Sequence, residues 1–440
     1  MISSSAMKAP ELDLPTLLRD LYAAALAAVE PGAILTAALD RAKTPDRSPH
    51  ILALGKAAPA MALAATNWLG KRHLTPAGGV VIGAAPSASP HPALRTHHGD
   101  HPEPRAHSAS SARLLEEACA AIAPGDIVWV LLSGGASSLL GAPVAGMTDH
   151  DYQELCHTLL GSGLPIVEVN RIRKRFSRWG AGRLAAAIEG ADVTVMVLSD
   201  VVGDDFASIG SGPCVGDPST AEVVRNDLIG SSIGGILPPS LLIHLEDVIS
   251  GRLPETPKPA ASCFRRVTHQ VIGGNRMAVQ AAASKAESLG FRTTAPIRPI
   301  VGEASIVGRT IGETVVKRTP EGPWCAVWGG EAIVTLGTES GKGGRCQEIA
   351  LAAAERFAQL GGMRRIGLLA IGTDGRDGPT DAAGAIVTPE TWNAIKAAGR
   401  DPAADLKHHD AYPALDAAGG LVRTGLSGTN VNDLVIAVEL

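Results

Sequence analysis

The sequence is poor in aromatic residues, in paired cysteines and in long apolar runs, and each shortage excludes a class of protein. Aromatic residues make up 3% of the 440 residues, so the strands must be built from Val, Ile and Leu. The six Cys are scattered singly with no CxxC pair, which argues against a zinc ribbon or a disulfide framework. The longest apolar run, residues 127–132, is far too short to span a bilayer, and the N-terminus has no apolar signal core. A reducing, cytoplasmic location is therefore expected.

An excess of one sign of charge is also missing. The formal net charge is −5 at pH 7, which argues against a dedicated binder of nucleic acid or of an anionic membrane. One anion-binding pocket built from a few Lys and Arg is still compatible with this net charge. We therefore expect small-molecule substrates as partners, with no nucleic acid and no membrane, and a homodimer stays open.

Two catalytic signatures are absent, and a third is present only in form. The chain has no GxxxxGK[ST] pattern and no GxSxG elbow, which disfavours a standard P-loop and an α/β-hydrolase. Residues 180–185 match GxGxxA, but a dinucleotide fingerprint should follow a strand. Here the match follows a basic segment that is expected to be helical. We interpret the GxGxxA match as coincidental.

What the sequence does contain is a regular alternation of strands and helices, with abundant Gly (50) and Pro (30). Continuous apolar strands separated by Ala-rich helices are typical of parallel sheets covered on both faces. The prediction is an α/β protein of two three-layer αβα domains with mostly parallel sheets around an interdomain cleft. A Pro-rich linker at 251–261 separates a larger, Rossmann-like domain (1–255) from a second domain (265–420). The last strand, within 421–440, could return to the first domain.

Unusual residues follow four of the predicted strands. They are Lys56, the segment 133–138, Asp200 and Asp374. Because α/β sheets bind ligands at the carboxyl ends of their strands, this coincidence predicts a functional site.

The segment 133–138 suits a phosphate group. Its small residues let backbone N–H groups converge on an anion, and a helix starting there would add its positive dipole. An ordinary strand-to-helix turn is the alternative, since Gly-rich turns are common. The predicted nucleotide or phosphate-binding residues are Ser133, Gly134, Gly135, Ala136, Ser137 and Ser138.

Three cations are predicted to bind substrate: Lys56, Arg173 and Arg345. Lys56 is expected to lie in the first turn of a helix, where the dipole favours anions, so an anionic ligand would explain its position. Arg345 ends the Gly-rich segment 341–345, which we expect to be a mobile loop, and its replacement should lower turnover while the melting temperature barely moves. Arg173 belongs to a basic segment that could instead be a solvated helix face.

Acidic residues supply the remaining candidates. Asp200, Asp204 and Asp205 could hold Mg²⁺ (or Mn²⁺), a hard cation that prefers oxygen ligands. Asp200 or Asp374 could orient or deprotonate an attacking hydroxyl, which places both with Lys56 and Arg345 as catalytic candidates. Asp is also common in Gly-rich turns for conformational reasons alone.

An ordered set of motifs gives the chain a family resemblance, which extends from about residue 13 to 440. The motifs are GKAA (55–58), HPEP (101–104), LSGGASS (132–138), NRIRK (170–174), SDVVGDD (199–205), SIGSGP (208–213), GGE (329–331), GKGGR (341–345), GTDG (372–375), GPTD (378–381) and TNVND (429–433). In this order they resemble the bacterial class II glycerate kinases, the glycerate 2-kinase (DUF4147) family with a C-terminal MOFRL domain. One departure is the segment 179–183, where the family has a Lys-Gly-Gly-Arg-like stretch.

The resemblance implies an ATP-dependent enzyme that needs a divalent metal and phosphorylates D-glycerate at its 2-hydroxyl, giving 2-phosphoglycerate. It also implies that Lys56 and Arg345 correspond to the family's cleft Lys and Arg. ATP is then the co-substrate. Relatives are often named hydroxypyruvate reductase, so an NAD(P)H-dependent reductase is one alternative. A non-catalytic sugar-acid-binding protein is another.

Overall fold

The chain folds into two compact units, each with its own sheet. The computed structural model describes residues 13–296, 298–319, 321–337, 340–360, 362 and 364–440. One unit is Pro31–Gly274, which we call the middle unit. The other combines Met1–Glu30 with Asn275–Leu440, and we call it the terminal unit.

These units correct the domain boundaries predicted from sequence, 1–255 and 265–420. Helix α1 (Leu14–Ala28) belongs to the terminal unit, where its apolar face is buried and Tyr22 Oη donates to Gly372 O at 3.0 Å. The Pro-rich segment 251–261 lies inside the middle unit and is no linker between the two. The last strand stays in the terminal unit, paired on both sides. Composition marked the irregular segments but not which sheet each neighbouring element joins.

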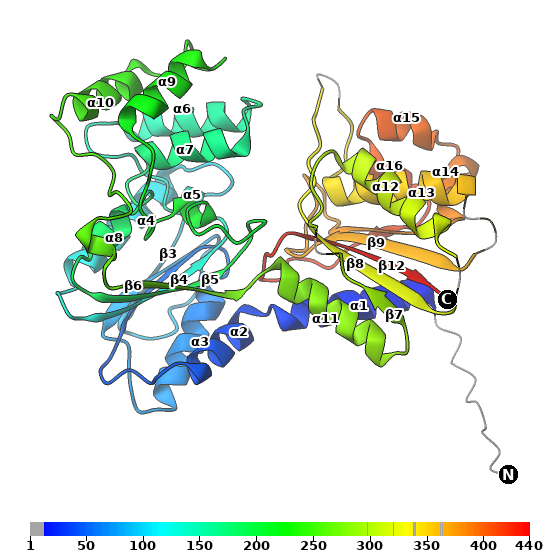
Figure 1. The fold of residues 1–440 in the computed structure, drawn as a ribbon, viewed down its shortest axis with the longest axis horizontal. Coiled ribbons are helices and arrows are strands. Elements are labelled where there is room, and N and C mark those ends of the chain that lie inside the picture. The colour runs from blue at the N-terminus through cyan, green and yellow to red at the C-terminus, as the bar shows by residue number, and fades with distance from the viewer. Residues whose placement is uncertain (1–12, 297, 320, 338–339, 361, 363) are drawn as a thin grey trace. The chain divides into compact units, whose positions relative to one another are not determined.

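The middle unit contains a six-stranded sheet in the order β3-β2-β1-β4-β5-β6, and every pairing in it is parallel. Figure 1 shows α2 and α3 on one face of this sheet and α4, α5 and α8 on the other. The elements are α2 (Pro31–Arg41), β1 (His50–Leu54), α3 (Ala58–Gly70), β2 (Gly78–Gly83), β3 (Leu94–His98), α4 (Ala106–Ala120), β4 (Ile127–Ser133), α5 (Ala136–Leu139), α6 (Asp149–Leu160), α7 (Ile166–Phe176), α8 (Arg183–Ala187), β5 (Asp192–Leu198), η1 (Ile209–Ser211), α9 (Ala221–Gly230), α10 (Pro239–Ile249), η2 (Ser262–Phe264) and β6 (Val267–Gly273).

Helices α6, α7, α9 and α10 form a small lobe of this unit with its own apolar core (Figure 1). Tyr152, Ile172 and Leu241 are nearly or fully buried in it. The lobe positions α7, the helix that carries the basic segment.

The terminal unit also has six strands, in the order β11-β10-β9-β12-β8-β7. Only β7 and β8 pair in parallel. The other neighbours are antiparallel because β10 and β12 run against the remaining four strands. The elements, after α1, are α11 (Asn275–Ser288), β7 (Arg292–Thr294), α12 (Ala304–Lys317), β8 (Trp324–Gly330), α13 (Arg345–Leu360), β9 (Ile366–Gly372), β10 (Gly384–Val387), α14 (Thr391–Ala397), α15 (Pro402–Lys407), α16 (Ala411–Ala417), β11 (Leu421–Val422) and β12 (Asp433–Glu439).

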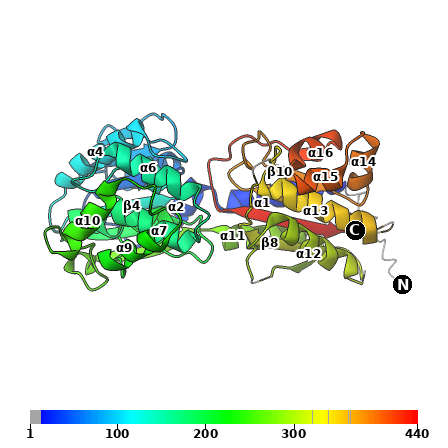
Figure 2. The ribbon, with the colours of Figure 1, turned by 90° about the horizontal axis from the view of Figure 1, so that it is seen from above.

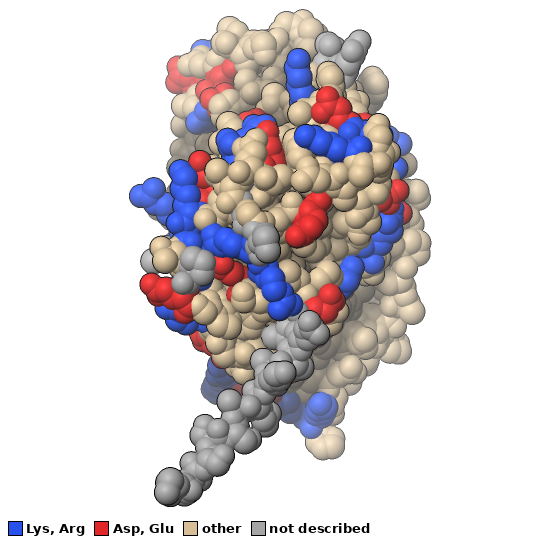
Figure 3. Space-filling model, turned by 90° about the vertical axis from the view of Figure 1, so that its right-hand side faces the viewer, with Lys and Arg blue, Asp and Glu red and all other residues tan. Residues whose placement is uncertain are grey.

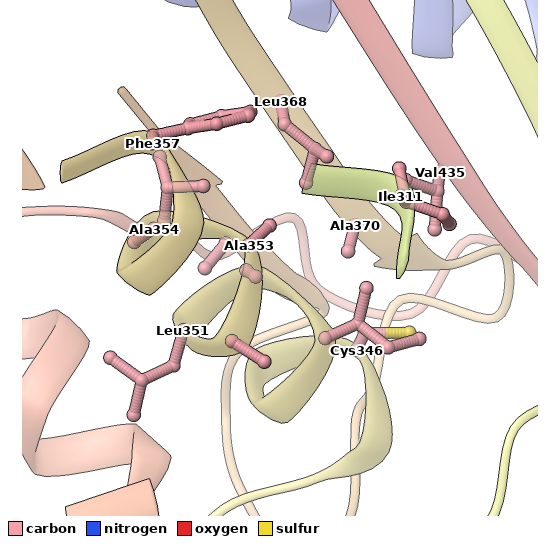
Figure 4. Packing of buried hydrophobic residues seen from close by; sticks show 14 of the residues in the cluster. Ile311, Cys346, Leu351, Ala353, Ala354, Phe357, Leu368, Ala370 and Val435 are labelled. Atoms are coloured by element: carbon pink, nitrogen blue, oxygen red, sulfur yellow. The ribbon is translucent and has the colours of Figure 1, made fainter. Parts of the chain in front are cut away.

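Helix α13 is the centre of the terminal unit's core. Figure 2 shows it between α12 on one side and α14–α16 on the other, and Figure 4 shows Phe357 of this helix beside Leu368 of β9. Ala353 and Ala354 bring the helix close to its neighbours because their side chains are small, and both are fully buried. With α1 and α11 on the opposite face, this unit is also three-layered (Figure 1). The α/β class with three-layer units is confirmed, and four of the six strands of this sheet share one direction.

Figure 3 shows one face of the terminal unit, on which both Lys and Arg and Asp and Glu are exposed. Exposed ion pairs such as Arg292–Glu321 (2.8 Å) are typical of this unit. In the part of the chain that the structure describes, no single helix is long and apolar enough to cross a membrane; α1 and α2, a bent pair, pass that test only together, by length and composition.

Candidate active site

In the middle unit, hydrogen bonds join the residues that follow β1 to the end of β4, and these bonds fix the backbone position of Lys56. Gly55 has φ +123°, and a Cβ there would collide with Ser133. Lys56 N donates to Gly134 O at 2.9 Å, and Ala57 N donates to Ser133 Oγ at 3.0 Å. The predicted Lys56 and the predicted phosphate loop are therefore one structure at the carboxyl ends of adjacent strands.

Two glycines of the loop make room for charged side chains. A Cβ on Gly134 would collide with the carboxylate of Asp200, which follows β5. Gly135 has φ +85°, and its Cβ would lie 3.2 Å from Lys56 Cγ and 3.3 Å from His101 Cδ2. Asp200, Lys56 and His101 therefore pack directly onto the loop backbone. His101 is a site residue that the sequence analysis missed, although its HPEP motif was visible.

The rest of the loop is held by hydroxyl groups. Ser137 Oγ lies 2.7 Å from Ser211 Oγ, and Ser138 Oγ donates to Pro102 O at 2.6 Å. Helix α5 has only four residues, so it offers much less of a dipole than the sequence analysis expected. Backbone N–H groups are what this loop presents to an anion.

Asp200 is a carboxylate under two opposing influences. Burial raises its pKa above the usual value, and the positive charges of Lys56 and Arg173 lower it in part. The net direction is upward. A carboxylate with a raised pKa next to a cation is suited to accept a proton from a hydroxyl group.

Of the basic segment on α7, Arg173 is the residue that faces the loop. Arg173 Nη2 donates to Asn170 Oδ1 at 2.8 Å, while its Nε is buried and has no hydrogen-bond partner among the described residues. With Ser137 and Ser138 it lines a cavity of about 20 Å³, enough for about one water.

The other cations of this segment serve the fold. Arg171 pairs with Asp227 (2.7 Å), Lys174 with Asp217 (3.1 Å), and Arg175 with Glu255. Arg175 is 1% exposed, so a solvated helix face does not describe the segment.

The predicted metal set of Asp200, Asp204 and Asp205 does not assemble. Asp205 accepts hydrogen bonds from Ser208 Oγ (2.6 Å) and Ala207 N (3.2 Å), which is the conformational role of an Asp in a turn. Across the described ranges, no three His, Cys, Asp or Glu side chains gather where they could hold a metal ion. The donor set therefore does not fit a metal cage made by protein groups alone.

In the terminal unit, Arg345 is held by two carboxylates. Its Nε and Nη2 donate to the two carboxylate oxygens of Asp433, and Nη1 lies 3.1 Å from Glu331 Oε1. Asp433 is 1% exposed. The expectation that Arg345 can be replaced without affecting stability must be revised, because removing one partner of a buried pair costs about 3–5 kcal/mol.

The loop before Arg345 is packed on both sides, contrary to the mobile loop predicted. Lys342 N donates to Asp410 Oδ1 at 2.8 Å, and Tyr412 N donates to Lys342 O at 2.9 Å. Lys342 Nζ lies 4.1 Å from the centre of the Tyr412 ring. The glycines of this loop allow close packing; a Cβ on Gly344 would collide with Asp377.

Asp374 lies near the Arg345 pair, in the turn that follows β9. Its Oδ1 accepts a hydrogen bond from Arg376 N at 3.0 Å, and its charge contributes to raising the pKa of Asp433, after burial. The sequence analysis found Asp374 and Arg345 but did not single out Asp433 or Glu331, although both lay in quoted motifs.

The GxGxxA match at 180–185 has no strand before it. It begins after α7, which ends at Phe176, and runs into α8, which begins at Arg183. The coincidental interpretation is confirmed, because the fingerprint requires a strand that ends at the pyrophosphate.

Known families match both parts of the chain. A family described as "Domain of unknown function (DUF4147)" matches residues 17–246, and the MOFRL family matches residues 324–433. The second match ends at Asp433, so it includes the residues around Arg345.

Curated relatives and a solved structure cover nearly the whole chain. "Glycerate 2-kinase" of Pyrococcus horikoshii is 36% identical (88% of this chain, 87% of the relative), and "D-glycerate 2-kinase" of Thermotoga maritima is 37% identical (88% and 90%). A "Putative hydroxypyruvate reductase" of Agrobacterium vitis is 35% identical (87% and 97%). The crystal structure of a glycerate kinase from Thermotoga maritima superposes with a TM-score of 0.84 at 34% identity, covering 97% of this chain and 99% of that one. This chain belongs to the class II glycerate kinase family.

Proposed function

We propose that this protein is an ATP-dependent glycerate 2-kinase that transfers the γ-phosphoryl group of ATP to the 2-hydroxyl of D-glycerate. The observation that carries the proposal is the arrangement in the middle unit, where Lys56 and Asp200 both pack against the loop 133–138 at the ends of three adjacent strands. The names of the relatives supply the substrate.

Each group has a role in that transfer. The backbone N–H groups of the loop bind phosphate oxygens, and Lys56 with Arg173 neutralises charge on phosphate or on the glycerate carboxylate. Asp200 accepts the proton of the 2-hydroxyl as that oxygen bonds to the γ-phosphorus and the bond to ADP breaks. Arg345 is a further cation for a substrate anion. Asp374 is the alternative base.

The metal is proposed as part of the nucleotide substrate. Mg²⁺ (or Mn²⁺) usually keeps several waters and is bound through substrate phosphates with only one or two carboxylates. A chain without a three-ligand cage among its described residues is compatible with that mode. No step above is assigned to a protein-held metal.

A reductase is the second candidate, because relatives carry that name. The GxGxxA segment gives the reductase no support, since this segment follows a helix and a turn.

We also propose a cytoplasmic enzyme with glycerate and ATP as its only partners, which binds neither nucleic acid nor membrane. Its mass in solution, by light scattering, decides between monomer and homodimer.

The test is incubation with ATP, Mg²⁺ and D-glycerate, followed by ³¹P and ¹H NMR of the product. We expect ADP and 2-phosphoglycerate, both dependent on glycerate and lost when EDTA is added. Formation of 3-phosphoglycerate would refute the position of transfer. Consumption of NADH with hydroxypyruvate, without ADP formation from glycerate, would establish the reductase instead.

A further inference from the structure

The aspartate at the start of β12 lies where several glycine-rich motifs of the terminal unit meet. Asp433 pairs in register with Gly330, the last residue of β8, and with Gly372, the last residue of β9. It therefore lies at the carboxyl-end edge of both strands, although it begins its own. Asn275 Nδ2 donates to its backbone oxygen at 3.0 Å, which holds this end of the strand against α11.

The side chain of Asp433 binds the guanidinium group of Arg345. Both of its oxygens accept hydrogen bonds from Arg345, at Nε and, at 3.0 Å, at Nη2. This fork-to-fork contact fixes the plane of the guanidinium as well as its position. Arg345 Nη1 is left for a different partner, Glu331, at 3.1 Å.

The two carboxylates differ sharply in exposure. Asp433 is 1% exposed and Glu331 is 44% exposed, while Arg345 is 36% exposed. A buried partner holds the inner edge of Arg345, and a partner in contact with solvent holds the outer nitrogen. Only the second can be exchanged for a soluble anion at small cost, because exposed ion pairs are worth about 0–1 kcal/mol.

The opposite end of the same strand provides an internal comparison. Glu439 is 5% exposed and is held by Arg318 and Arg364, whose side chains are 21% and 20% exposed. That cluster pairs a buried carboxylate with two arginines that are both less exposed than Arg345. The Glu439 cluster is our example of a purely structural ion pair in this unit. The Asp433 pair differs from it because its arginine is more exposed to solvent.

We propose that Asp433 is a positioning residue that fixes Arg345 so that its Nη1 edge can exchange Glu331 for an anionic group of the substrate. The proposal rests on the proposed function, in which Arg345 binds such an anion. Asp433 acts through Arg345 and does not touch the substrate itself.

The test compares Asp433→Asn with Glu439→Gln, a matched neutralisation of the other buried carboxylate of β12. We expect both variants to lose several degrees of melting temperature. Only Asp433→Asn should lower kcat for glycerate phosphorylation at least tenfold, because an amide cannot accept both guanidinium hydrogen bonds. A kcat for Asp433→Asn within twofold of that for Glu439→Gln overturns the proposal.

A double-mutant cycle separates positioning from other effects. Arg345→Gln should lower kcat, and adding Asp433→Asn to it should change kcat less than twofold, because the residue through which Asp433 acts is already gone. The neutral Gln–Asn pair can hydrogen-bond, so the double variant remains testable if Asp433→Asn alone does not fold. Losses that multiply in the double variant overturn the proposal. Wild-type kcat in Arg345→Gln would refute the role of Arg345 in the proposed function, which is a distinct result.

Discussion

Replacing Gly135 by alanine tests whether the contact between the loop and Lys56 matters for activity. The new Cβ would lie 3.2 Å from Lys56 Cγ and 3.3 Å from His101 Cδ2, so both side chains must move by a few tenths of an ångström. Misplacement by about 1 Å can cost about a hundredfold in rate. For this smaller shift we expect kcat/KM for glycerate to fall about tenfold.

A change at Gly135 also strains the backbone, and Gly125 supplies the control for that strain. Gly135 has φ +85° and Gly125 has φ +87°, but a Cβ on Gly125 would meet no atom within 4 Å. Placing an L-residue in this region costs about 1–2 kcal/mol at either position. Gly125→Ala and Gly135→Ala should therefore lose similar stability, and only the second should lose activity.

The assay pairs urea unfolding with initial rates of ADP formation at varied glycerate concentration. The reasoning is refuted if Gly135→Ala matches Gly125→Ala in both stability and kcat/KM. It is also refuted if Gly125→Ala loses as much activity as Gly135→Ala, because strain alone would then explain the loss.

Two further changes test the middle unit. Lys56→Met keeps the bulk against Gly135 and deletes the charge, so we expect at least a hundredfold loss of kcat/KM with a melting temperature within a few degrees of wild type; unchanged rates at low and saturating glycerate would remove Lys56 from the site. Glu255→Gln leaves the buried Arg175 without its carboxylate, so it should lower the free energy of unfolding at pH 7 by about 3–5 kcal/mol, measured by urea unfolding. The control is Glu321→Gln, which breaks an exposed ion pair and should lower it by about 0–1 kcal/mol. Burial raises the pKa of Glu255, but hydrogen bonds from Arg175 and two backbone N–H groups outweigh burial and lower the pKa to about 2. The stabilisation that Glu255 contributes is therefore present above about pH 4.5 and is lost as the pH falls toward 2. Glu255→Gln should lack this loss of stability at acid pH.

The sequence located the middle-unit site well because one local rule governs it. Every strand of that sheet is parallel, so residues that follow successive strands reach the same edge. Lys56, the loop 133–138 and Asp200 follow β1, β4 and β5, which are neighbours in the sheet. The rule needs no knowledge of distant contacts.

The sequence analysis named Arg173 as a candidate, but showing that it is the cation of its segment that faces the loop needed tertiary structure. Periodicity placed Arg171, Arg173, Lys174 and Arg175 on one helix but could not say which have partners. Those partners, such as Asp217 and Glu255, come from segments far along the chain. The packing of the lobe, not the helix itself, leaves Arg173 facing Ser137 and Ser138.

The same rule explains why Asp433 escaped prediction. In a sheet where every strand is parallel, the residue that begins a strand lies at the edge opposite to the site. Strand β12 is antiparallel to β8 and β9, between which it is inserted, so its first residue reaches the edge where those two strands end. Nothing in the sequence of 429–433 gives the direction of that strand. In a mixed sheet, the polar residue that begins an antiparallel strand therefore belongs among the candidates, beside those that follow its parallel neighbours.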